Sequence, residues 1–395
     1  MAHHLRRLPT LAVVLLLALT TTSVMAQSDG STSPFMQRSE VCSAVGNLVF
    51  DGNEANRSIS DQVNLGPRTP GSNASATLRA TIAQLGLDSG WAVDTSTHTT
   101  HNITFTNLFL THTGAGGPGQ PMLFLSAHYD SRNKADQDVN ETNRTLPVPG
   151  ANDAASGTAI LIEFIDIIPA LNLDHSVTLF FNDAEDQNEN YTEGAQAWSE
   201  TLTDGEIENI EAFILLDMVG DADLQLHNIA PGNTTLTQRL QTLGGALGLV
   251  ATEEGCDGTQ GLDIMQYNIT TAVLDDHVHP LALGIPSVDI MDPVYGEPKQ
   301  GTFGTYWHTM EDTPDKVSAE SLQRVGQLVE LGLRTQAFMD LEPEPIIPPQ
   351  TDNTAEAETA ESASSPNTGL TVLAGFGLLM VLGLIGTTEW LLRKS

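Results

Sequence analysis

Apolar and polar positions along the chain follow two patterns, one typical of buried strands and one typical of helices. Short, nearly continuous apolar runs bounded by polar turns predict β-strands at 103–110, 121–127, 176–181, 212–216 and 287–291. Apolar residues repeating every three or four positions predict helices at 72–85, 154–168 and 318–338. The alternation predicts an α/β fold, a three-layer sandwich whose mostly parallel or mixed central sheet is covered by helices on both faces.

Apolar segments near both ends of the chain predict targeting and anchoring. Arg6 and Arg7 precede an apolar run, and small residues at 24–26 suit a signal peptidase, so we expect a signal peptide over 1–26. Apolar and small residues from 370 to 387 are long enough to cross a bilayer. We therefore expect a transmembrane helix over 369–392, and the positive-inside rule places the tail, 393–395, in the cytoplasm.

The chain between these two segments divides by composition. Residues 27–341 carry the predicted strands and helices, and we expect them to form one globular domain. Residues 342–368 are rich in Pro, Glu, Ala, Thr and Ser, a composition that cannot bury enough apolar surface to fold, so we expect a disordered stalk. This organisation predicts a single-pass protein on the cell surface, with the globular domain outside.

Charge and cysteine content narrow the function further. The formal net charge of −34 and the pI of about 4.3 argue against nucleic acid or an anionic membrane surface as a partner, because both would be repelled. A high-salt habitat would produce the same acidic surplus. The two cysteines, Cys42 and Cys256, cannot build a thiolate metal cage; a disulfide between them is allowed but not required. Asn-x-Ser/Thr triplets would carry glycans only in a host that attaches them.

Five separated fragments offer side chains that bind metals or transfer protons, most of them directly after a predicted strand. They are residues 127–131, 150–153, 182–186, 216–220 and 306–309. Zinc-like cations need several oxygen and imidazole ligands converging on one point, and strands that end on the same sheet edge deliver them there. The adjacent Glu185 and Asp186 are especially informative, because close carboxylates repel unless a cation or a shared proton compensates them. The pattern predicts a metallohydrolase.

In their order along the chain, these fragments resemble the co-catalytic zinc aminopeptidases, a family whose fold the glutaminyl-peptide cyclotransferases share. The resemblance runs from about Leu65 to Leu331, and it includes the sequences GPRTPGS at 66–72, DDH at 275–277 and WHTMEDT at 307–313. It implies an enzyme that uses zinc, with two ions expected, to remove N-terminal residues from peptides with a free N-terminus.

The resemblance also assigns a role to each candidate residue. Glu185 would be the general base, and Asp130 would be the carboxylate that orients a histidine ligand. His128 and Asp217 would bind one zinc, and Asp186 and His308 would bind the other. Asp153 would bridge the two ions. The implied metal ligands are therefore His128, Asp153, Asp186, Asp217 and His308.

Some positions depart from the family pattern or leave alternatives open. Many relatives have two glutamates where this chain has Glu185 and Asp186, so the second zinc is less secure than the first. A cyclotransferase that forms N-terminal pyroglutamate needs only one zinc and a proton shuttle, and it fits most of the same residues. Asp289 stands where cyclotransferases tend to have His, which favours a peptidase. Trp307 would lie in the core or wall the substrate pocket, and Asp276 would support the site or be a plain loop carboxylate.

A third alternative is a non-catalytic ectodomain that keeps the fold as a binding scaffold. Such domains usually lose metal ligands, whereas every expected ligand position in this chain holds a competent residue. The sequence therefore favours an enzyme.

Overall fold

The computed structural model describes residues 37–341, apart from 188 and 189. The predicted signal peptide, stalk, transmembrane helix and cytoplasmic tail lie outside these residues. Among the helices in the described part of the chain, none has the length and apolar character needed to cross a membrane.

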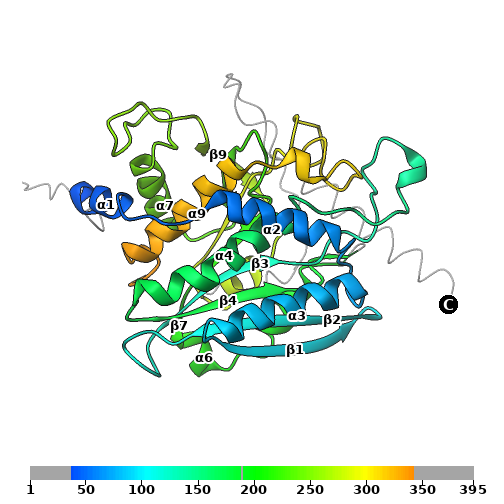
Figure 1. Cartoon of the computed structure of the whole chain (residues 1–395), viewed down its shortest axis with the longest axis horizontal. Helices are drawn as coiled ribbons and strands as arrows, with labels where there is room; N and C mark the ends of the chain where they lie inside the picture. Colours follow the sequence, from blue (N-terminus) through cyan, green and yellow to red (C-terminus); the bar gives the residue numbers. More distant parts are fainter. Residues whose placement is uncertain (1–36, 188–189, 342–395) are drawn as a thin grey trace, which may run out of the picture. The chain divides into compact units, whose positions relative to one another are not determined.

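A six-stranded mixed sheet forms the centre of this part (Figure 1). Its strands, in spatial order, are β1 (Ala92–Thr100), β2 (Ile103–His112), β4 (Ser176–Asn182), β3 (Met122–His128), β7 (Ile210–Asp217) and β10 (Ser287–Met291). The last four of these run parallel to one another, whereas β2 is antiparallel to both β4 and β1. The predicted mixed sheet is confirmed.

Helices cover both faces of the sheet, because alternate strand residues point to opposite sides. In β3, Leu123 and Leu125 belong to the larger apolar core, whereas Phe124 belongs to a second core on the other face. The larger core includes residues of α2 (Gly52–Asn64), α3 (Asn73–Asp88), α4 (Ala155–Leu171) and α9 (Ala319–Arg334). The second core packs against α5 (Glu193–Ser199) and α6 (Asp204–Asn209). In Figure 1, α2 and α9 lie over α4 on one side of the sheet.

All predicted strands and helices occur, and serine caps explain where two of the helices begin. The Ser72 hydroxyl accepts a hydrogen bond from the Ser75 amide at the start of α3, and Ser318 does the same for Ser321 at the start of α9. The remaining elements are α1 (Arg38–Val45), α7 (Thr234–Ala246), α8 (Val278–Ala282), β5 (Asp186–Gln187), β6 (Asn190–Tyr191), β8 (Leu226–Ala230), β9 (Met265–Ala272), and the 3-10 turns Glu141–Asn143 and Pro314–Lys316.

A disulfide joins Cys42 of α1 to Cys256, 214 residues further along the chain. The sequence allowed this pairing without requiring it. A covalent link that closes so long a segment removes many conformations from the unfolded chain, so it stabilises the folded state.

We expect replacement of both Cys42 and Cys256 by serine to lower the free energy of unfolding by about 2–5 kcal/mol. Chemical denaturation of the segment 37–341 would measure the loss, and adding a reductant to the double variant should change nothing further. Equal stability of the variant and the oxidised parent would show that the link does not constrain the unfolded chain.

Candidate metal centre

The carboxyl ends of three neighbouring parallel strands bring the predicted site residues to one edge of the sheet. His128 ends β3, Asp217 ends β7, and Glu185 and Asp186 follow β4 after a short turn. Asp153 precedes α4, whose Gly157 lies so close to β7 that an added Cβ would meet the Leu216 carbonyl at 2.3 Å. The absence of a side chain there lets the start of α4 approach the end of β7.

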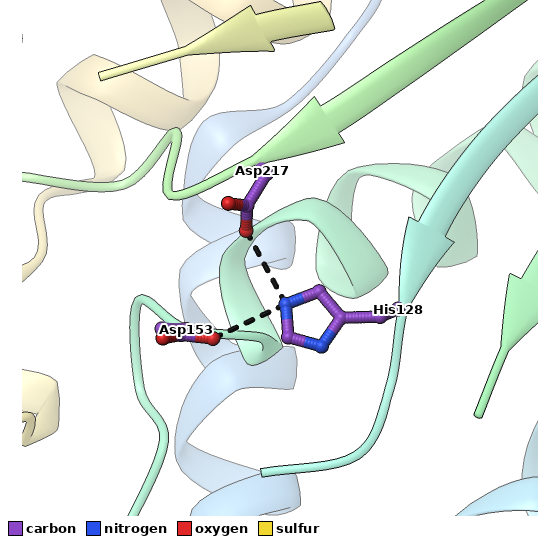
Figure 2. A group of neighbouring side chains, drawn as sticks. All are labelled: His128, Asp153 and Asp217. Carbon is purple, nitrogen blue, oxygen red and sulfur yellow. Dashed lines mark hydrogen bonds and ion pairs between the residues drawn. The ribbon is translucent and has the colours of Figure 1, made fainter. Parts of the chain in front are cut away.

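Five of the predicted residues form two groups that share Asp153. In the first group, His128 Nε2 lies 3.1 Å from Asp153 Oδ1 and 3.3 Å from Asp217 Oδ1. Figure 2 shows both carboxylates pointing at the same imidazole nitrogen. In the second group, His308 Nε2 lies 3.0 Å from Asp186 Oδ2 and 3.6 Å from Asp153 Oδ2. The two oxygens of Asp153 therefore face different groups.

The geometry and burial of these groups fit divalent metals. Two ligand atoms about 2.1 Å from a tetrahedral zinc lie about 3.4 Å apart, close to the separations seen in both groups. Within each group, the candidate ligand atoms all lie within 4.8 Å of one another. Asp153, Asp186 and Asp217 are all buried residues, so without a cation their carboxylates repel one another strongly. Burial and the charge of Asp186 accordingly raise the pKa of Asp153.

Asp130 connects the first histidine to the turn that carries Glu185. Its Oδ1 lies 3.4 Å from His128 Nδ1, which leaves Nε2 of that ring facing Asp153 and Asp217. The same carboxylate accepts hydrogen bonds from the amides of Glu185 (3.1 Å) and Asp186 (3.2 Å). One buried side chain thus fixes both a candidate ligand and the backbone of the candidate base, as an orienting residue should.

Glu185 lies beside the two groups without belonging to either. Its Oε2 is 3.8 Å from His128 Nδ1, and the preceding residue, Ala184, adopts a left-handed backbone conformation with φ of 62°. Burial raises the pKa of Glu185 well above its usual range; His128 opposes the rise and Asp186 adds to it. A carboxylate with a raised pKa is suited to accept and return a proton near neutral pH.

Four residues without an assigned role from the sequence complete the site. Arg68 donates to the carbonyls of Pro149 and Gly150, both at 2.5 Å, and so holds the turn before Asp153. Asp312 accepts hydrogen bonds from the amides of Asn152 (2.8 Å) and Asp153 (3.3 Å). The other two are Arg132, which contacts Asp186, and Asp136, which contacts His308. Arg68 and Asp312 lie within the motifs GPRTPGS and WHTMEDT, so the sequence could have indicated that these two residues belong to the site.

The sequence left the roles of Trp307, Asp276 and Asp289 open, and the structure places all three. The ring of Trp307 stacks on His308 at 3.5 Å between centroids and packs against an apolar cluster that includes Met218 and Tyr295. Trp307 is half-buried, so it belongs to that cluster and still has an accessible surface. Asp276 and Asp289 are buried, and burial raises the pKa of Asp276 to about 7.

Comparison with known proteins identifies the family. The sequence profile of peptidase family M28 matches residues 107–331, more than half of the chain. The chain belongs to peptidase family M28. One relative is aminopeptidase YwaD of Bacillus subtilis (strain 168), which is 25% identical over 209 residues, or 53% of this chain and 39% of that protein. The chain therefore aligns with about two fifths of the length of this relative.

Solved structures show the same fold with two kinds of activity in their names. A glutaminyl cyclase of Porphyromonas gingivalis is 27% identical, with a TM-score of 0.61 over 73% of this chain and 99% of that one. A Zn-dependent exopeptidase from Parabacteroides distasonis is 24% identical, with a TM-score of 0.60 over 73% of this chain and 98% of that one. The second likeness shows the fold alone. M28 membership and the aminopeptidase relative support a hydrolase, and the cyclase neighbour leaves its activity to be tested.

Proposed function

We propose that this M28 member is a zinc-dependent aminopeptidase that removes N-terminal residues from peptides. The observation that carries the proposal is the pair of ligand groups that share Asp153, with Glu185 beside both and part of neither. Peptide hydrolysis needs this division of tasks, because a base that takes and returns a proton must not be held as a metal ligand.

The residues of the chain then have separate tasks in the reaction. Bound zinc would supply Lewis acidity, which polarises a scissile carbonyl and lowers the pKa of water. The Glu185 carboxylate takes a proton from the attacking water and returns it to the amine of the leaving peptide. Asp130 keeps Glu185 in place through its amide and keeps Nε2 of His128 directed at the metal position.

The carboxyl groups around the site suit a substrate with a free amino end. Besides the ligands, Asp275 and Asp276 are buried near Asp217, and burial together with the charge of Asp217 raises the pKa of both carboxyl groups. Their oxygens can accept hydrogen bonds from a protonated amine. Peptides with an acetylated N-terminus lack that charge and should be poor substrates.

A glutaminyl cyclase is the second candidate, and two observations favour it. One is the 27% identity to the Porphyromonas gingivalis cyclase over nearly the whole of that protein. The other is the buried carboxyl of Asp276, whose charge influences Glu185 and whose pKa is raised to about 7 by burial. Cyclisation uses the substrate's own amine as the nucleophile, so it needs a proton shuttle rather than an activated water. Glu185 and Asp276 are suitable members of such a shuttle.

Mass spectrometry on three unblocked peptides and one N-acetylated control would separate the two activities. We expect a peptide that begins with glutamine, and matched peptides that begin with leucine or alanine, to lose a whole N-terminal residue. An N-acetylated control should stay intact. Loss of ammonia alone from the glutamine peptide, with the leucine and alanine peptides unchanged, would assign the chain as a cyclase.

We also propose that the enzyme works outside the cell, held at the surface by the segment 369–392. The Cys42–Cys256 disulfide supports an oxidising compartment, because such links are rare in reducing cytoplasm. Protease added to intact cells should release an active fragment by cutting within 342–368. Release that requires cell lysis would argue against this orientation.

A further inference from the structure

Arg132 lies in the metal centre, although the sequence pattern gave it no role. Its guanidinium is buried and donates from Nη1 to Asp186 Oδ1 at 2.6 Å. From Nη2 it donates to Asp136 Oδ2 at 2.8 Å. The Tyr191 ring lies 5.1 Å from the guanidinium carbon, so an aromatic face also holds the cation in place.

These contacts close a ring of four side chains around the second ligand group. Asp186 uses Oδ1 for Arg132 and turns Oδ2 towards His308 Nε2, 3.0 Å away. Asp136 uses Oδ2 for Arg132 and places Oδ1 3.4 Å from His308 Nδ1. Of the three ligands in the second group, only Asp153 is shared with the first. Arg132 contacts Asp186 directly and is connected to His308 through Asp136.

The ring holds the carboxylate of Asp186 by one oxygen and leaves the other facing His308. Because an aspartate side chain reaches only a short way from the backbone, its carboxylate must be held at a fixed angle if one oxygen is to face a metal. A guanidinium is a rigid planar donor that fixes carboxylate orientation better than an ammonium group does. Groups that orient metal ligands in this way typically contribute about 10–100-fold to metal affinity.

We propose that Arg132 is a positioning residue for the second metal site: it leaves Asp186 one metal-facing oxygen and, through Asp136, sets the ring orientation of His308. The inference rests on the proposed function in one respect, that the centre binds divalent metal in both groups. It does not depend on whether the reaction is hydrolysis or cyclisation, because its test measures metal binding alone.

The test isolates each site in a separate background. In Asp217→Ala, the group of Asp153, Asp186 and His308 remains intact; in His308→Ala, the group of His128, Asp153 and Asp217 remains intact. Zinc is titrated calorimetrically into the metal-free full chain of each background, with and without Arg132→Gln. We expect Arg132→Gln to weaken zinc binding about 10–100-fold in the Asp217→Ala background. In the His308→Ala background it should change binding less than about twofold.

Companion variants separate positioning from charge. If the charge of Arg132 mattered only by repelling the metal, Arg132→Gln would bind zinc more tightly and Arg132→Lys would bind as the parent does. Positioning predicts weaker binding for both, because lysine is a point donor that cannot bridge two carboxylates in a plane. Arg144→Gln serves as the matched control, since Arg144 lies in the same loop but donates to the Asp138 carbonyl.

The zinc titrations can contradict the positioning role of Arg132 in two ways. Unchanged or tighter zinc binding by Arg132→Gln in the Asp217→Ala background, or an equal loss in both backgrounds, would overturn the positioning role. If Arg132→Gln does not fold, the near-isosteric Asp136→Asn carries the same comparison, because it breaks the ring at the His308 end. A parent that binds no divalent metal would instead contradict the proposed function and remove the second site with it.

Discussion

Replacing Glu185 by glutamine is expected to lower kcat by about 10²–10⁴-fold while leaving metal content unchanged. Glutamine has nearly the same shape but cannot accept a proton, and Glu185 lies outside both ligand groups. The backbone amide of residue 185 keeps its hydrogen bond to Asp130 in the variant, so the turn that carries Asp186 should persist. The measurement is steady-state turnover of an aminoacyl substrate, together with metal analysis of the same sample.

Two comparisons make this result interpretable. Glu208→Gln, an exposed change on α6, should leave both turnover and metal content as in the parent. Asp186→Ala should lower metal content as well as turnover, because it removes a ligand. A Glu185→Gln variant that turns over substrate at the parental rate would mean that another group acts as the base.

The fold was predictable from the sequence where strands are buried and less so where a strand is exposed, as at the β1 edge of the sheet. The strands β3, β4 and β7 consist almost wholly of buried residues, so each appears as an apolar run. The edge strand β1 is half-exposed and rich in threonine, and its sequence contains no apolar run. It is held instead by its pairing with β2 and by threonine pairs across the two strands, such as Thr97 with Thr106. Pairing of this kind is not visible in periodicity.

The resemblance to the zinc aminopeptidases supplied the five candidate ligands, and four of them lie at a strand end or just before a helix, whereas His308 lies in the loop after β10. The structure places them in two groups, and their roles remain a prediction. The residues that hold them were harder to predict. Arg132 and Asp136 lie in the polar loop over 130–149, where charged residues are normally solvated. Only the fold turns Arg132 inward, to a position 1% exposed between Asp186 and Asp136.

The buried carboxylates of the metal centre differ in how their charge is compensated. Asp130 and Asp312 each accept two backbone amides, which compensates part of their buried charge. Asp153 and Asp217 instead direct oxygens at the His128 ring, and a bound cation is what would compensate them. The site therefore separates carboxylates that the protein itself satisfies from carboxylates that depend on a metal.

That separation leads to the second large effect, expected for Asp153→Ala. Asp153 contributes an oxygen to each ligand group, so its removal should take zinc content from up to two ions per chain to less than one. Activity should fall with it to background. Asp94→Ala, an exposed change on β1, should keep the parental metal content. Undiminished zinc in Asp153→Ala would show that Asp153 is not a shared ligand.

Thermal unfolding provides a readout of Asp153→Ala that does not depend on activity. In chelator, the variant should be at least as stable as the parent, because it removes one of several buried carboxylates that repel one another; burial and Asp186 already raise the pKa of Asp153. In zinc at about 100 times the dissociation constant, the parent should gain about 2.7 kcal/mol from each site that binds the folded chain alone, and the variant should gain little. A variant that is less stable than the parent in chelator, yet gains as much from zinc, would mean that Asp153 supports the fold rather than the metal.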